Sequence, residues 1–203
     1  MCFYFGLPET TVKITGRYKR PIVAPEAFVP TEKWNGFAHP TTLVITNDQP
    51  EVITSASWGL LPQWSQDIKF RKNTLNARIE TVAQLPSFKE YVGNRCLIPA
   101  SCFYDWRHEG TKKIPYIVVN QETEIFSFAG IYSDWTDERT NTVLRTYSML
   151  TTEANATMQY IHNTKQRMPV ILKLADEERW LGGAAVGDFA FPYSANLVGF
   201  VHQ

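Results

Sequence analysis

The chain of 203 residues has no excess of charge of either sign, because 20 lysines and arginines balance 20 aspartates and glutamates. Overall charge therefore does not attract nucleic acid, and any surface for it must be a local patch. No apolar run approaches the roughly 20 residues that a membrane-spanning helix needs. The opening residues, MCFYFGLPET, lack the basic segment of a signal peptide, so we expect a cytoplasmic protein with no membrane partner.

Cysteine is also scarce, and the three that occur, Cys2, Cys96 and Cys102, have no metal-ligand spacing. An odd number of dispersed cysteines is typical of free thiols in a reducing compartment rather than of a disulfide framework. We expect no metal and no organic cofactor. Cys96 lies within a strand-like run, where a buried packing role is favoured. Cys102 lies next to the segment that carries Asp105; a packing role is favoured for it, and a place close to Asp105 is the alternative.

No linker, repeat or low-complexity segment divides the chain, so we expect a single domain over residues 1–203. Short runs rich in β-branched and aromatic residues predict strands at residues 42–46, 51–55, 95–99, 116–119, 125–131, 146–150 and 169–172. Helices are expected at residues 81–91, 155–161 and 175–181. Strands that do not alternate regularly with helices favour an α+β fold with a mostly antiparallel sheet.

Cys2 offers chemistry that an internal cysteine lacks. If Met1 is removed, as is usual before a small residue, Cys2 carries an α-amine and a thiol on neighbouring carbons. The amine forms an imine with an aldehyde, and the thiol then closes a five-membered thiazolidine. Model-peptide pKa values of about 8 for the amine and about 8.5 for the thiol leave both partly deprotonated near neutral pH. The alternative is an ordinary small residue near a frayed terminus.

Six further motifs follow along the chain. They are WGLLPQW at residues 58–64, NARIET at 76–81, RCLIPA at 95–100, FYDW at 103–106, IH at 161–162 and RMPVIL at 167–172. Behind an MC start, this ordered set resembles the SRAP family, the SOS response-associated peptidase domain, from Cys2 to about Leu172. The resemblance implies a barrel-like sheet and covalent trapping of abasic sites in single-stranded DNA, as part of the response to DNA damage.

The resemblance also implies a role for each matching residue of the catalytic group. Cys2 forms the thiazolidine with the ring-opened sugar, and Asn76 helps to hold that sugar. Asp105 handles protons at the α-amine, and His162 is the acid and base that opens the sugar and closes the link. Taken singly, Asn76 could instead cap a turn, Asp105 could be a loop acid, and His162 could be a core or surface histidine.

Three more residues match positions that contact DNA. The resemblance implies that Arg78 binds a phosphate, although Arg78 could also pair with Glu80. It places Pro25 and Trp64 against the bases, where an exposed aromatic ring can stack. Two other tryptophans, Trp58 and Trp106, are expected in the core.

The sequence departs from the family pattern at several places. Tyr4 replaces an arginine, and Asp105 replaces a glutamate whose side chain is one methylene longer. Leu85 and Pro86 stand near the place of a second phosphate-binding arginine. Residues 163–166 form an insertion, whose Lys165 offsets some of the lost positive charge. Basic clusters at residues 17–20 and 69–72 are candidates for phosphate contact or are simply solvated.

Two other functions fit the same residues. A cysteine peptidase would use Cys2 as nucleophile and His162 as base, with Asp105 or Asn76 orienting the base, and would cleave its own Met1–Cys2 bond or another peptide. A DNA-binding module without chemistry is the third possibility. A peptidase needs only the thiol, whereas cross-linking also needs the α-amine. We expect a monomer whose partner is single-stranded DNA that contains abasic sites.

Overall fold

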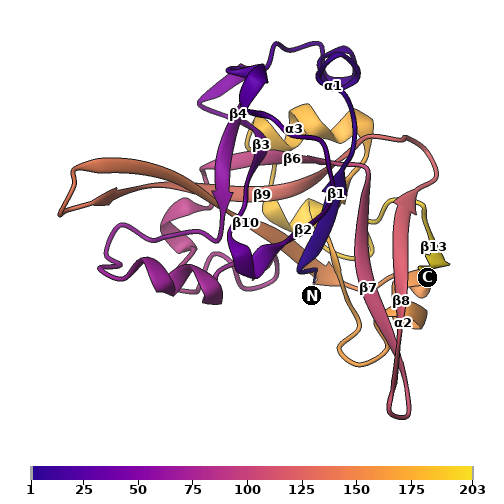
Figure 1. Ribbon diagram of the computed structural model, residues 1–203. Coiled ribbons are helices and arrows are strands. Elements are labelled where there is room, and N and C mark those ends of the chain that lie inside the picture. Colours follow the sequence, from indigo (N-terminus) through magenta and orange to yellow (C-terminus); the bar gives the residue numbers. More distant parts are fainter. Residues whose placement is uncertain (1, 203) are drawn as a thin grey trace.

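The computed structural model describes residues 2–202, and its centre is a small barrel of five strands (Figure 1). Around the barrel, antiparallel pairs join β4 (Gln49–Trp58), β3 (Thr41–Thr46), β6 (Arg95–Ala100), β9 (Phe126–Asp137) and β10 (Thr142–Glu153). Parallel pairing of β10 with β4 closes the ring. The predicted single domain with a mostly antiparallel, barrel-like sheet is confirmed.

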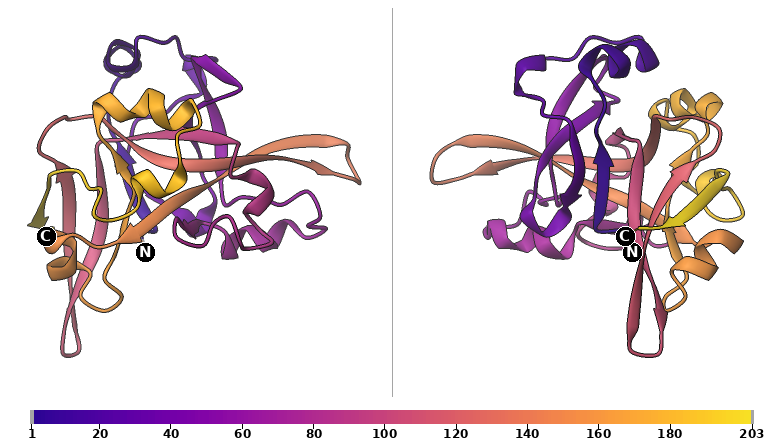
Figure 2. Two further views of the ribbon diagram at one scale, coloured as in Figure 1. Left: turned by 180° about the vertical axis from the view of Figure 1, so that it is seen from behind. Right: turned by 45° about the vertical axis from the view of Figure 1, so that its right-hand side comes forward.

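Further strands extend the barrel and build a second sheet. β5 (Asn76–Arg78) and β11 (Arg167–Pro169) pair with β10, and β12 (Ile171–Leu172) pairs with β9. The second sheet is antiparallel throughout and runs in the order β13 (Leu197–Val201), β8 (Lys112–Asn120), β7 (Cys102–Glu109), β1 (Tyr4–Leu7) and β2 (Thr31–Asn35). The hairpins β9–β10 and β7–β8 project from the body in different directions in every view (Figures 1 and 2).

The helices are short and lie outside the barrel. The α-helices are α1 (Thr11–Tyr18), α2 (Ala156–Ile161) and α3 (Glu177–Leu181). The 3-10 helices are η1 (Pro25–Ala27), η2 (Gly36–Ala38), η3 (Ile68–Asn73), η4 (Lys89–Tyr91), η5 (Leu174–Asp176) and η6 (Val186–Phe189). No helix among residues 2–202 is long and apolar enough to cross a membrane.

Six of the seven predicted strand segments lie in strands, apart from Ile125 just before β9, and the seventh, residues 169–172, is divided at Val170 between β11 and β12. Two of the three predicted helices form. Asn155 caps α2 as an acceptor, since its Oδ1 lies 3.0 Å from the backbone nitrogen of Met158. The predicted helix at residues 81–91 is wrong. Pro86 lies in its middle, and the segment forms a series of turns that ends in η4. Helix α1 was not predicted.

Aromatic packing fixes the start of the chain against the barrel. Phe5 on β1 is fully buried, with its ring centroid 5.1 Å from that of Trp58 and 5.6 Å from that of Phe128. Trp58 is a core residue, as predicted, and its indole nitrogen donates to the carbonyl of Leu75 at 2.8 Å. Because Leu75 precedes Asn76, this bond places β5 beside β1.

A glycine is required where the chain leaves β4. Gly59 has a φ of +114°, and a Cβ there would lie 2.8 Å from the carbonyl oxygen of Arg71. Its backbone nitrogen donates to the carbonyl of Tyr147 on β10 at 2.8 Å. At this turn the chain leaves β4, which pairs with β10 at Thr146 and Tyr147. β5 then pairs with β10 further along, at residues 149–151.

Candidate active site around Cys2

Cys2 lies just before β1 and is enclosed by protein. Its exposed fraction is 0%, and its thiol donates to the carbonyl of Tyr4 at a sulfur–oxygen distance of 3.3 Å. Burial raises the pKa of the Cys2 thiol to about 12, and the nearby negative charge of Asp105 adds to the rise. The thiol is therefore protonated at neutral pH and needs a base before it can react.

Asn76 holds Cys2 from the barrel side. In β5, Ala77 is buried, whereas Asn76 is half-buried and Arg78 is exposed, because successive side chains of a strand point to opposite faces. The Asn76 side-chain nitrogen donates to the carbonyl of Cys2 at 2.9 Å. Its Oδ1 is buried and has no hydrogen-bond partner within residues 2–202. An acceptor without a donor is costly to bury, so this oxygen is suited to a polar hydrogen on a ligand or on the processed terminus.

Asp105 presents a second buried acceptor from β7. Only 5% of the residue is exposed, and Oδ1 accepts a hydrogen bond of 2.9 Å from the backbone nitrogen of Trp106. Its Oδ2 has no hydrogen-bond partner in the described part of the chain. Burial raises the pKa of Asp105, and the neighbouring imidazole of His162 offsets part of the rise. A carboxylate with a raised pKa is a stronger proton acceptor than an ordinary aspartate.

His162 follows the last residue of α2 and faces Asp105. Its Nδ1 lies 3.9 Å from Asp105 Oδ2, 2.8 Å from the carbonyl oxygen of Arg167 and 3.3 Å from the backbone nitrogen of Arg167. A protonated Nδ1 donates to that carbonyl, and an unprotonated Nδ1 accepts from that N–H, so either neutral tautomer is accommodated. Burial lowers the pKa of His162, and the charge of Asp105 opposes the shift. The imidazole is therefore neutral at physiological pH and able to accept a proton.

An ion pair joins the motif that carries Asn76 to the RMPVIL motif that follows His162. The Arg167 guanidinium binds both carboxylate oxygens of Glu80, at 2.9 and 2.8 Å, and donates to the carbonyl of Thr151 at 2.8 Å. Glu80 is thus engaged by Arg167 and not by Arg78. The side chain of Arg78 is exposed and forms no hydrogen bond or ion pair with the described residues, which leaves its guanidinium accessible to a phosphate.

An open pocket of about 520 Å³ leads to this cluster. Its lining combines Asp105 and His162 with Phe3, Tyr4, Phe37, Trp106, His108, Lys113, Thr164 and Lys165. The prediction that Trp106 is a core residue is wrong, since it is half-buried and lines the pocket. Cys96 and Cys102 are buried, as predicted. Nowhere in residues 2–202 do three or more His, Cys, Asp or Glu side chains gather to hold a metal ion.

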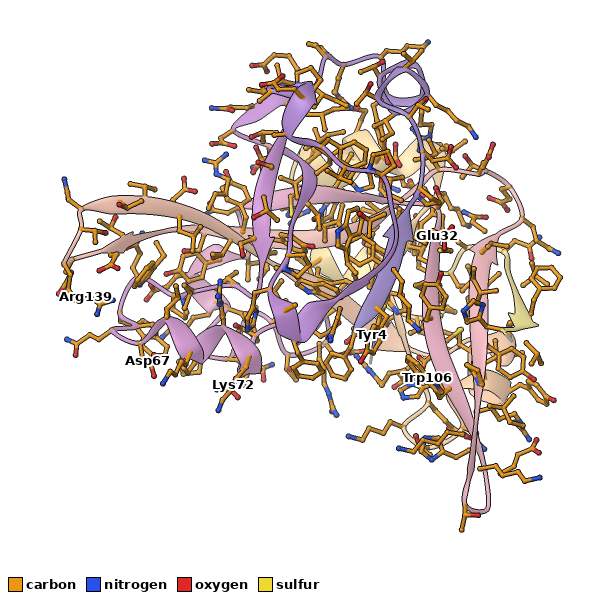
Figure 3. All side chains as sticks on the ribbon, in the orientation of Figure 1. Tyr4, Glu32, Asp67, Lys72, Trp106 and Arg139 are labelled. Atoms are coloured by element: carbon orange, nitrogen blue, oxygen red, sulfur yellow. The ribbon has the colours of Figure 1, made fainter. Side chains whose placement is uncertain are left out.

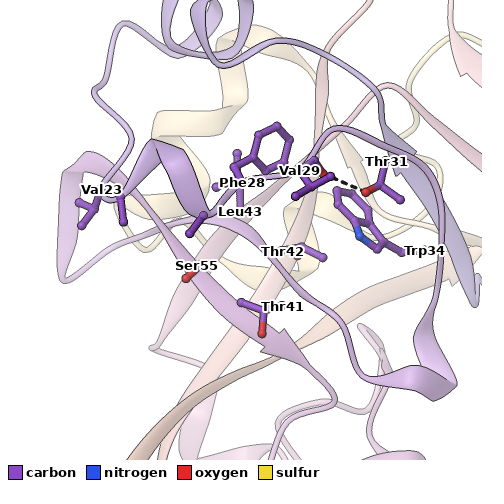
Figure 4. A pocket seen from close by; sticks show the side chains of 11 residues that line it. Val23, Phe28, Val29, Thr31, Trp34, Thr41, Thr42, Leu43 and Ser55 are labelled. Atoms are coloured by element: carbon purple, nitrogen blue, oxygen red, sulfur yellow. Dashed lines mark hydrogen bonds between the residues drawn. The ribbon is translucent and has the colours of Figure 1, made fainter.

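Trp64 and Pro25 lie outside this pocket. Trp64 is 51% exposed, packs edge-on against Phe70 at 5.1 Å, and lines a separate pocket of about 430 Å³ with Lys69 and Lys72. Pro25 begins η1 on the surface, next to a third pocket of about 250 Å³ whose lining it does not join. Figure 4 shows that third pocket, where the segment from Val23 to Thr31 runs beside Trp34 and strands β3 and β4.

The buried charge of Asp105 should reduce the stability of the fold. Because burial raises its folded-state pKa, no cost arises at a pH below the unfolded pKa of about 4; the cost grows as the pH rises from the unfolded to the folded pKa and is complete above the folded value. We expect Asp105→Asn to increase the free energy of unfolding by about 1 kcal/mol at pH 7, and by much less at pH 4. Urea denaturation at both pH values measures this. The exposed Asp188→Asn is the control, and an equal gain at both pH values would contradict the assignment.

Comparisons with known proteins agree on one family. The family model described as SOS response associated peptidase (SRAP) matches residues 1–193. The abasic site processing protein YoqW of Bacillus subtilis is 42% identical over 126 residues, which cover 61% of this chain and 54% of YoqW. The abasic site processing protein HMCES of Gallus gallus is 29% identical over 160 residues, which cover 66% of this chain and 46% of HMCES. The matches thus span about half the length of these relatives.

Solved structures share the whole fold. A crystal structure of a protein from Bacteroides thetaiotaomicron superposes with a TM-score of 0.90 at 32% identity, over 100% of this chain and 92% of that one. A protein from Bordetella bronchiseptica superposes with a TM-score of 0.84 over the full length of both chains. Its identity is 23%, so this second likeness concerns the fold alone.

Proposed function

Because the chain belongs to the SOS response associated peptidase (SRAP) family, we propose that it processes abasic sites in DNA by bonding to them covalently through Cys2. The observation that carries the proposal is the clustering of Cys2 with two buried acceptors that lack a hydrogen bond from the described residues, Asn76 Oδ1 and Asp105 Oδ2. Such acceptors suit the polar hydrogens of an α-amine and a sugar hydroxyl. Relatives of the chain are named abasic site processing proteins, which agrees with this substrate.

The proposed reaction begins with removal of Met1, a residue outside the described part of the chain. The freed α-amine of Cys2 attacks the C1′ aldehyde of the ring-opened deoxyribose, and a water molecule leaves as the imine forms. The thiol of Cys2 then adds across the carbon–nitrogen double bond, so that a carbon–sulfur bond forms and a proton passes from sulfur to nitrogen. The product is a thiazolidine, and no oxidant or reductant is consumed.

Asp105 and His162 supply the proton transfers in this scheme. The raised pKa of Asp105 suits it to take a proton from the α-amine, which must be neutral to attack. Neutral His162 takes a proton from the hemiacetal hydroxyl during ring opening, and the protonated imidazole returns it to the ring oxygen. Asn76 orients Cys2 through its carbonyl.

DNA would approach as a single strand, which lets the abasic sugar reach a buried cluster. Exposed Arg78, two residues from Asn76, is placed to bind a phosphate near the sugar. Trp64 offers an exposed ring for base stacking beside Lys69 and Lys72. Pro25 would contact a base only if the strand reached the surface at η1.

A denaturing gel tests the proposal directly. The purified protein, mixed with a single-stranded oligonucleotide that carries one abasic site, should give a protein–DNA band that survives heating in detergent. The same oligonucleotide with an intact base should give none. The absence of the band with the abasic substrate, in protein whose mass shows that Met1 has been removed, would reject the proposal.

A cysteine peptidase that uses the same residues is the alternative. A peptidase nucleophile is activated by a lowered thiol pKa, whereas burial and Asp105 raise the pKa of Cys2 to about 12. This direction favours amine-first chemistry, in which the thiol attacks an imine already bound beside it.

A further inference from the structure

The pocket lined by Asp105 and His162 carries positive charge although the chain is neutral overall. Two exposed lysines, Lys113 on β8 and Lys165 in the loop after α2, line it together with His108, whereas Asp105 is its one acid. Neither lysine has a recorded ion pair with a described residue. Lys165 lies near enough to His162 to lower the pKa of that imidazole. A concave surface with unneutralised ammonium groups favours an anion.

The two lysines are held on the same pocket by a specific contact. The side chain of Asn163 forms two hydrogen bonds with the backbone of His108: its nitrogen donates to the carbonyl at 2.8 Å, and its oxygen accepts from the amide at 3.0 Å. Asn163 belongs to the segment 163–166 that the family pattern lacks. This inserted loop is therefore fastened to β7, the partner strand of β8, and brings Lys165 to the pocket that Lys113 also lines.

Aromatic rings form another part of the same pocket. Phe37 is 53% exposed and packs against Phe3, with 4.8 Å between the ring centroids and 36° between the ring planes. Tyr4 and Trp106 pack edge-to-face at 5.1 Å, side by side in Figure 3, and the ammonium of Lys33 lies over both rings. Because the rings of Tyr4 and Trp106 already hold a cation, the exposed ring of Phe37 is the surface open to stacking.

The pocket lies at one end of a path across the molecule. In Figure 1, the η3 segment, the N-terminal end of the chain and the β7–β8 hairpin follow one another along the lower side. The pocket of Trp64 and Lys72 is at η3, and the pocket of Trp106 and Lys113 is at the hairpin. A strand whose abasic sugar reaches Cys2 would meet both pockets, one on each side.

We propose that the 520 Å³ pocket is a nucleotide subsite, which binds the nucleotide directly next to the abasic residue. Its base stacks on Phe37, and its phosphate lies between Lys113 and Lys165. This inference rests on the proposed function for the position of the abasic sugar. It adds a binding site built from residues that the SRAP resemblance does not assign, and it gives the inserted loop a role in substrate binding.

The test measures binding without chemistry. Oligonucleotides carry a tetrahydrofuran residue, which has the shape of an abasic sugar but no aldehyde, and fluorescence anisotropy gives Kd. Phe37→Ala, and separately Lys113→Ala combined with Lys165→Ala, should each weaken binding about tenfold. The double variant should also make the plot of the logarithm of the association constant against the logarithm of the salt concentration less steep, by about 0.7 per lysine removed. Lys112→Ala and Phe200→Ala, exposed neighbours outside the pocket, are the matched controls and should change Kd less than twofold.

Shortened substrates locate the subsite. One oligonucleotide ends at the tetrahydrofuran residue on its 3′ side and another on its 5′ side. With one of the two, Phe37→Ala and the wild type should bind equally, because the stacked nucleotide is missing. A Phe37→Ala effect that is the same on all three substrates, or is matched by Phe200→Ala, overturns the proposal. If the variants weaken binding as expected but no covalent band forms on a true abasic site, the subsite stands and the proposed function fails. If a covalent band forms but the variants bind as tightly as the wild type, the proposed function stands and the subsite fails.

Discussion

Replacing Cys2 by serine should abolish the heat-stable protein–DNA band entirely. Serine keeps the α-amine and almost the same volume, so the buried site and its hydrogen bond from Asn76 remain. The imine still forms, but an alcohol is too weak a nucleophile to close a lasting ring, and water reverses the imine during heating. The measurement is the gel with one abasic oligonucleotide and equal amounts of each protein.

Borohydride reduction provides the internal control for this variant. With reductant present, Cys2→Ser should yield a band, because the imine is trapped as an amine before it hydrolyses. A variant with one additional residue before Cys2 should give no band with or without reductant, since its α-amine is displaced. A heat-stable band from Cys2→Ser without reductant would show that the cross-link is not a thiazolidine. Cleavage of a peptide by the lengthened variant would favour the peptidase alternative.

Asp105→Asn should slow cross-linking about 100-fold at saturating DNA, the lower end of the range for loss of a general base. The amide keeps the shape of the carboxylate and its hydrogen bond from the Trp106 backbone, but it accepts no proton from the α-amine. Single-turnover gels over time give the rate. Since the same variant is expected to be more stable at pH 7, a slow reaction would not reflect a damaged fold.

The separation of rate from affinity decides the role of Asp105. Binding of tetrahydrofuran DNA should be unchanged or slightly tighter, because the variant removes a negative charge from a pocket that receives phosphate. Raising the pH should restore part of the lost rate, since more of the α-amine is then neutral without a base. A fall in affinity with an unchanged rate at saturation would show instead that Asp105 holds DNA.

Local sequence patterns predicted the strands of the barrel well because these strands are rich in β-branched and aromatic residues, whereas the barrel itself was expected only from the resemblance. They failed where one residue outweighed the pattern. Pro86 breaks the apolar spacing that predicted a helix at residues 81–91. Helix α1 was missed because Val12, Ile14 and Gly16 lower helix propensity; it forms on a Thr10 cap and buries Ile14.

The candidate site was predicted only where a motif carried it. Cys2, Asn76, Asp105 and His162 were expected together, and the structure gathers them. Phe37, Lys113 and His108 were not identified, since they belong to separate segments and no spacing relates them. The pairing of β1 with β2 and β7 brings these segments to one pocket, and such pairings of distant strands leave no local trace in the sequence.

The enclosure of Cys2 also affects how well its thiol resists oxidation and alkylation. Peroxides and alkylating agents attack sulfur as the thiolate, and a thiol with a pKa of about 12 is almost never in that form at cellular pH. In the chain that carries Met1, the zero exposed fraction of Cys2 also keeps such agents from the sulfur. If the proposed reaction holds, the sugar brings its own electrophile, so the thiol of Cys2 can remain protonated and reduced until DNA binds.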